Sequence, residues 1–173
     1  MDCRATAVAS EGNVISTRDR LAGLAVARHD LWRACMHEYA HLHVARHFGV
    51  HGHVTIEANP DGGLYESHYV GQLHVFTLVP TAHGRAMVGL AGFVAEWLCE
   101  NPVITAEDLF AELDLDPESL SESDRRYAPN VTPRTVGAAL WLVRKLWPDI
   151  VADAELHASA EARIAGLQEV EAA

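Results

Sequence analysis

The stretch LWRACMHEYAHLHVARHF, residues 31–48, decides the fold, because it has the periodicity of a packed helix and carries reactive side chains. Its apolar residues recur mostly three or four positions apart, which gathers them on one helix face: Leu31, Ala34, Cys35, Leu42 and Ala45. Asp30 is a suitable N-cap, and Gly49 is a residue type that commonly ends helices. We therefore predict a helix over residues 31–48, preceded by a separate short helix over residues 18–27.

An H-E-x-x-H motif, His37-Glu-Tyr-Ala-His41, lies inside this predicted helix. Four residues turn through about 400°, so both imidazoles project from one face, one turn apart, and can reach one zinc ion at about 2.0–2.1 Å. Glu38 lies about 100° further round, where it would contact a water on the metal. The motif predicts a Zn²⁺ site in which Glu38, as general base, helps a metal-activated water to hydrolyse a peptide bond.

A catalytic zinc site usually has three protein ligands and an open position. The motif supplies two of these ligands, and three residues are candidates for the third. His47 follows His41 at the six-residue spacing of the metzincins, but a continuous helix would turn it about 120° away. Glu96 is a lone acidic residue in a very apolar segment. Asp124 follows Ser121 in a pattern that also fits a helix cap. Spacing alone does not choose between Glu96 and Asp124.

The remaining sequence predicts an α+β fold that is mainly α-helical, with a zincin-like motif helix and a small sheet or hairpin. Strands are expected at residues 54–56, 64–70 and 73–79, with a turn at 59–63. Helices are expected at residues 81–100, 106–113 and 124–128, from Thr132 to a break at Pro148, and at 149–167. Gly89 and Gly92 would allow another helix to approach closely. We expect one domain over residues 1–173, with residues 1–17 loosely ordered.

Composition narrows the class of protein. A formal net charge of −11 argues against nucleic-acid binding, and no apolar run reaches the roughly 18 residues of a membrane span. The first residues do not have the pattern of a signal peptide. Three cysteines without a close pair argue against a disulfide framework, so we expect a cytoplasmic protein. Trp141 and Trp147 would suit a helix-mediated homodimer.

The order of these segments resembles the peptidase domain of FtsH-type ATP-dependent zinc proteases, from about Trp32 to about Ala128. The motif His37–His41, followed by Val44-Ala-Arg and Gly49, is similar to that family's H-E-A-G-H-A-x-V-A-R segment. Further similar blocks are Val54-Thr-Ile, Gly63-Leu-Tyr, Gly89-Leu-Ala-Gly-Phe-Val-Ala-Glu, Ile104-Thr and Ser123-Asp. The resemblance implies that Asp124 is the third zinc ligand and that Glu96 lies close to the site.

The sequence also departs from that family. Ala40 replaces the glycine of H-E-A-G-H, and the chain contains no Gly-x-x-x-x-Gly-Lys nucleotide-binding motif. We therefore expect a stand-alone zinc endopeptidase that cleaves exposed peptides or one protein partner. The alternative function is a non-catalytic zinc-containing binding or regulatory module derived from a peptidase fold.

Overall fold

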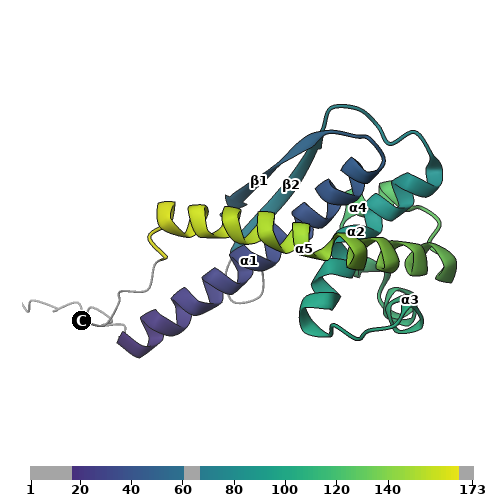
Figure 1. The fold of residues 1–173 in the computed structure, drawn as a ribbon. Coiled ribbons are helices and arrows are strands. Elements are labelled where there is room, and N and C mark those ends of the chain that lie inside the picture. The colour runs from purple at the N-terminus through teal and green to yellow at the C-terminus, as the bar shows by residue number, and fades with distance from the viewer. Residues whose placement is uncertain (1–16, 61–66, 168–173) are drawn as a thin grey trace, which may run out of the picture.

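The computed structural model describes residues 17–60 and 67–167, which are mainly helical and include a two-stranded antiparallel sheet (Figure 1). The predicted α+β, mainly α-helical class is confirmed. The elements in chain order are α1 (Thr17–His47), β1 (Gly52–Ala58), β2 (Tyr69–Val75), α2 (Ala82–Glu100), α3 (Ala106–Leu115), the 3₁₀ turn η1 (Pro117–Ser119), α4 (Glu122–Tyr127) and α5 (Pro133–Ile164). The predictions for residues 1–16 and for 61–66 lie outside the described residues. None of the described helices has both the length and the apolar character to span a bilayer.

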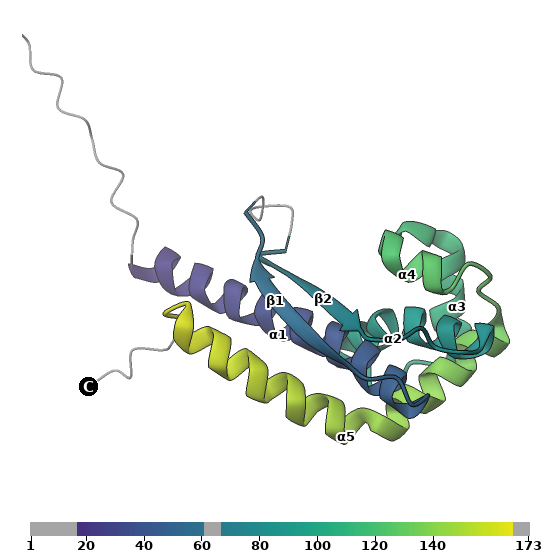
Figure 2. The ribbon, with the colours of Figure 1, turned by 90° about the horizontal axis from the view of Figure 1, so that it is seen from above.

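Helix α1 is the centre of the molecule, because it contacts the sheet, α2 and α5 (Figures 1 and 2). Its second half is buried on several faces, through Leu31, Cys35, Met36, Ala40 and Val44 among others. Helix α2 is buried along most of its length and packs on both α1 and α5. The H-E-x-x-H motif therefore lies in a helix that packs against the sheet, α2 and α5, which limits the movement of its backbone.

The predicted break at Asp30 is wrong, because α1 runs without interruption from Thr17 to His47. Residues 28–30 contain neither proline nor glycine, so nothing in the local chain forces the helix to end. The Asp30 carboxylate does not cap a helix and instead accepts hydrogen bonds from His68. Asp30, which the sequence predicted to be an N-cap, therefore forms a tertiary contact with His68.

The prediction of two strands at 64–70 and 73–79 is also wrong, because the described residues contain one strand there, β2. It pairs with β1 in an antiparallel register that runs from Gly52 opposite Val75 to Ala58 opposite Tyr69. Val79 leaves the sheet and is buried in the core, with 1% of its surface exposed, just before the Thr81 cap of α2. Burial of that side chain ends the strand early.

The predicted break at Pro148 is wrong too, since α5 continues through it to Ile164. Proline inside a helix costs about 3 kcal/mol relative to alanine. Both halves of α5 bury side chains in the same core, with Leu142 and Val143 before the proline and Ile150 after it. Each large apolar side chain contributes about 1.5–3 kcal/mol when buried, so packing outweighs the local penalty.

Candidate metal centre

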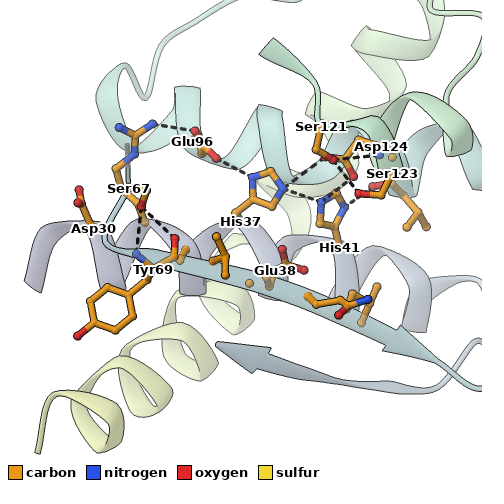
Figure 3. Close-up of a pocket in the computed structure, with 18 of the residues that line it drawn as sticks. Asp30, His37, Glu38, His41, Ser67, Tyr69, Glu96, Ser121, Ser123 and Asp124 are labelled. Atoms are coloured by element: carbon orange, nitrogen blue, oxygen red, sulfur yellow. Dashed lines mark hydrogen bonds and ion pairs between the residues drawn. The ribbon is translucent and has the colours of Figure 1, made fainter. Parts of the chain in front are cut away.

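Three side chains converge between α1 and α4 (Figure 3). His37 and His41 come from α1 and Asp124 from α4, and their ligand atoms all lie within 4.8 Å of one another. The two Nε2 atoms are 2.9 Å apart, Asp124 Oδ1 lies 3.2 Å from His41 Nε2, and Asp124 Oδ2 lies 3.5 Å from His37 Nε2. The structure thus brings together the three residues that the sequence and the resemblance singled out as metal ligands.

The opposite nitrogen of each ring is held by an oxygen atom. His37 Nδ1 lies 2.6 Å from Glu96 Oε1, and His41 Nδ1 lies 2.6 Å from the backbone carbonyl of Val88. A carbonyl or carboxylate oxygen only accepts, so each Nδ1 carries the hydrogen, and each neutral ring presents a lone pair at Nε2. Two lone pairs that face each other at 2.9 Å require a proton or a cation between them.

The surrounding charges favour a cation at this point. Burial by itself would lower the pKa of His37, but hydrogen bonds with Asp124 and Glu96 outweigh it and raise that pKa to about 10. Burial would raise the pKa of Glu96 and of Asp124, yet contacts with His37 hold both pKa values below their usual range. Both carboxylates are therefore ionised, and a metal ion would replace the proton that they stabilise.

Glu38 lies beside the ligand group. With Glu96 and Asp124 it brings three carboxylates to the site, and Arg33 brings one guanidinium 2.7 Å from Glu96. Three carboxylates and one guanidinium have a formal net charge of two negative charges, which a divalent cation would neutralise. Among the described residues, the buried polar or charged side chains are Glu38, His41 and Asp124, all in this site. Burial of ionisable groups is costly, so their concentration here indicates a binding site.

Three glycines make room for these groups. A Cβ atom on Gly92 would lie 2.4 Å from His37 Nε2, and one on Gly71 would lie 2.3 Å from Glu38 Cγ. A Cβ on Gly89 would lie 2.6 Å from the Asp124 backbone oxygen, so glycine lets α4 approach α2 closely, as the sequence predicted. Any larger side chain at these positions would displace a group of the site.

The group opens onto a cleft of about 680 Å³, formed by α1, β2, α2 and α4. His37, Glu38, His41 and Asp124 all line it, and so do β2 residues from Tyr69 to Val75. Its volume lies in the range of small-molecule and cofactor sites. The candidate metal ligands and the general-base candidate therefore face one accessible space.

Neither of the other two ligand candidates is part of the ligand group. His47 is exposed at the end of α1 and does not belong to the ligand group. Glu96 contacts His37 at Nδ1, the nitrogen that faces away from Asp124, so it orients a ligand (Figure 3). Sequence reasoning missed Arg33, although its position four residues before His37 put it on the same helix face. The helix cap expected from Ser121 and Asp124 is present: Ser121 accepts a hydrogen bond from the Asp124 backbone N–H, and its hydroxyl donates to Asp124 Oδ2 at 2.7 Å.

No model of a known protein family matches the chain, and none of the curated proteins matches it significantly. The resemblance to FtsH-type peptidase domains therefore stays a prediction.

The donor set fits a first-row transition metal. Two ligand atoms of a tetrahedral zinc ion lie roughly 3.3 Å apart, which follows from metal–ligand distances of about 2.0–2.2 Å. The two Nε2 atoms are 2.9 Å apart, and each has one of the two Asp124 oxygens at a similar distance, 3.2 or 3.5 Å. Two imidazoles and one carboxylate are poor ligands for Mg²⁺ or Ca²⁺, which prefer oxygen atoms. His37, His41 and Asp124 could thus hold a metal ion without rearrangement of the backbone.

Asp124→Ala removes the carboxylate from the ligand group and is expected to lower zinc affinity by about 100-fold or more. His47→Ala removes an exposed imidazole from the same histidine-rich stretch and should leave the affinity unchanged. Elemental analysis and chelator competition on both purified variants measure this difference. Equal losses, or a larger loss in His47→Ala, would contradict the assignment.

Gly92→Ala is expected to lower zinc affinity by about tenfold or more, because its methyl group would occupy the space of the His37 ring. Gly137→Ala is the matched control, since a Cβ there would lie at an ordinary 3.6 Å from the Ala106 Cβ in another helix. Metal content and thermal stability should be measured together. An unchanged metal affinity in Gly92→Ala would mean that the His37 ring does not bind the metal in this orientation.

Proposed function

We propose that the chain is a zinc-dependent endopeptidase, with His37, His41 and Asp124 as ligands and Glu38 as general base. The observation that carries the proposal is the position of the Glu38 carboxylate, which is buried beside a three-ligand group at an open cleft. A structural zinc site is closed by four protein ligands, whereas the metal-binding group in the described residues contains three. This difference favours catalysis over the alternative, a non-catalytic zinc module.

A zinc ion held by these residues would act as a Lewis acid toward a carbonyl group and would lower the pKa of water to about 7. The residues of the chain do the rest. Glu38 accepts a proton in the cleft and can later return it to the leaving amine. Glu96 and the Val88 carbonyl hold the two imidazoles with Nε2 toward the metal, while Ser121 fixes the Asp124 carboxylate.

The choice of zinc rests on Glu38. Two histidines and one carboxylate with open positions also suit Fe²⁺, as in the iron-dependent oxygenases. The oxygenases bind oxygen and a cosubstrate at the open positions of the metal. Hydrolysis instead requires a general base next to the ligands, and a carboxylate such as Glu38 can serve as one. A buried Glu38 in an H-E-x-x-H helix therefore supports zinc, and the elemental analysis above distinguishes the two metals.

Within residues 17–60 and 67–167 no second strand pairs with the other edge of β2, and this open edge supports an extended peptide as substrate. The bonds from Phe76 N to His51 O and from Asn59 N to His68 O extend the β1–β2 register at its two ends. In an antiparallel ladder every second residue bonds to the partner strand, so the even-numbered residues of β2 face β1. The main-chain groups of Tyr69, Gly71, Leu73 and Val75 therefore point to the free edge.

A peptide paired with this edge would run along the cleft beside Glu38, because Gly71 packs directly on the Glu38 side chain. Main-chain pairing gives affinity without requiring one particular sequence. The lining residues of the cleft continue along β2 on both sides of Gly71, so a chain can extend in both directions. This continuity supports cleavage within a chain, as in an endopeptidase.

We further propose the reducing cytoplasm as the compartment. Cys35 and Cys99 are free thiols, and burial raises the pKa of Cys35 to about 12, so it is a packing residue. The predicted homodimer stays a prediction; Trp141 is largely exposed on α5 with Lys145 over its ring.

Glu38→Gln is expected to retain zinc and to lower hydrolysis by about 10²–10⁴-fold, because the amide cannot accept the proton. Fluorescein-labelled casein, incubated with and without chelator, provides the assay. Glu155→Gln on the exposed face of α5 is the matched control. The catalytic assignment fails if Glu38→Gln cleaves casein as fast as the wild type. Zinc-replete wild type that cleaves nothing would favour the non-catalytic module.

Val75→Pro removes a main-chain N–H from the free edge of β2 and leaves the ladder with β1 intact. Casein cleavage is expected to fall about tenfold or more, with zinc content unchanged. Val75→Ala trims the side chain but keeps the N–H, so it isolates the role of the backbone. Unchanged cleavage in Val75→Pro would show that substrates do not pair with this edge.

A further inference from the structure

The contact between Asp30 and His68 joins α1 to the start of β2. Asp30 Oδ2 accepts a hydrogen bond from His68 Nδ1 at 2.7 Å and another from the His68 backbone N–H at 3.2 Å. Both residues line the cleft, and Asp30 lies two helical turns before His37 on the same face of α1. The proposed chemistry uses neither side chain, yet their contact bridges the two walls of the site.

The two ends of β2 are held differently. Beyond Val75, a short segment leads to Val79, which is buried in the core, and to the Thr81 cap of α2. The chain itself therefore fixes that end of the strand. At the other end, Asp30 is the α1 side chain that bonds to the residue directly before Tyr69. A sheet of two strands is marginally stable alone, so this end depends on such a contact.

The distance between β2 and α1 determines the space around Glu38, and the two elements approach each other closely at Gly71. The Glu38 side chain fills the space that a Cβ atom would need there, so β2 cannot move closer to α1. Movement in the opposite direction would widen the cleft above Glu38 and shift the free edge of the strand. The Asp30–His68 contact lies three residues before Gly71 in the strand direction and opposes that movement.

We propose that the Asp30–His68 pair is a positioning latch that holds β2 at a fixed height over α1 and so sets the width of the cleft at Glu38. The effect on turnover rests on the proposed function, whereas the effect on strand position does not. The charge state of Asp30 agrees with this role. Partial burial would raise the pKa of its carboxyl, but the hydrogen bonds from the ring and backbone of His68 hold that pKa below its usual value.

The Asp30–His68 pair can be tested by a substitution in α1 that should not destabilise the helix. Aspartate is a weaker helix former than alanine, so Asp30→Ala should not weaken α1 locally. Loss of β2 order in that variant would then report loss of the contact with His68. Asp30→Asn keeps an acceptor oxygen and should rescue part of the effect.

Hydrogen–deuterium exchange on the full-length, zinc-loaded protein provides the first test. Asp30→Ala and His68→Ala are each expected to raise exchange of the hydrogen-bonded amides of residues 68 and 70 by about tenfold or more, with exchange in α2 unchanged. The double variant should exchange no faster than either single one, because both remove the same contact. Asp149→Ala and His83→Ala change exposed residues of the same types and should have no effect. Unchanged exchange in Asp30→Ala would overturn the latch.

Casein kinetics provide the second test, and they separate the two proposals. We expect Asp30→Ala to raise KM about tenfold while kcat stays within about twofold and zinc content is unchanged, because substrate alignment is lost but the catalytic groups remain. A wild type that does not cleave casein would refute the proposed function and leave the exchange result to judge the latch. Raised exchange with wild-type KM would overturn the role of the latch in substrate binding.

Discussion

The candidate site depends on two short hydrogen bonds, which the Nδ1–H groups of His37 and His41 donate to oxygen atoms. They fix the hydrogen of each imidazole on Nδ1 and turn both Nε2 lone pairs toward Asp124. Both acceptors belong to α2, so the chemistry of the α1 motif is set by the packing of a second helix. That packing is close because Gly92 leaves space for the His37 ring. Without α2, the same five-residue motif would be a pair of freely rotating histidines on a helix surface.

The site is also a concentration of charge inside an apolar fold. Carboxylates removed from water are costly unless they are paired. Glu96, which is partly exposed, bonds to Arg33 and His37, and the buried Asp124 bonds to Ser121 and faces both imidazoles. Burial of apolar side chains in the core formed by α1, α2 and α5 offsets the free-energy cost of keeping these ionisable residues away from water. The conflict between charge and burial is resolved most simply by a divalent cation.

Sequence-based prediction succeeded where the local signal was strong and failed where packing overrode it. The starts of the helices predicted at residues 81, 106 and 132 agree with the structure to within one residue, because a threonine before each helix satisfies its free N–H groups. The same rule failed at Asp30, whose acceptor oxygens serve His68. Pro148 was read as a break because the local penalty is visible in the sequence, whereas the burial of Ile150 that outweighs it is not. The two strands expected between 64 and 79 became one, since their limits depend on the register with β1.

The sequence by itself determined the candidate ligand pair and the adjacent carboxylate, because helical geometry alone puts His37 and His41 on one face with Glu38 beside them. It could not choose between Asp124 and Glu96, since both are acidic residues far along the chain. The tertiary structure made that choice: Gly89 allows α4 to approach α2, which brings Asp124 to the Nε2 side of the imidazoles and leaves Glu96 on the Nδ1 side. The physical reason is that spacing within one helix is fixed by the backbone, whereas the distance between two helices is fixed by the side chains that pack between them.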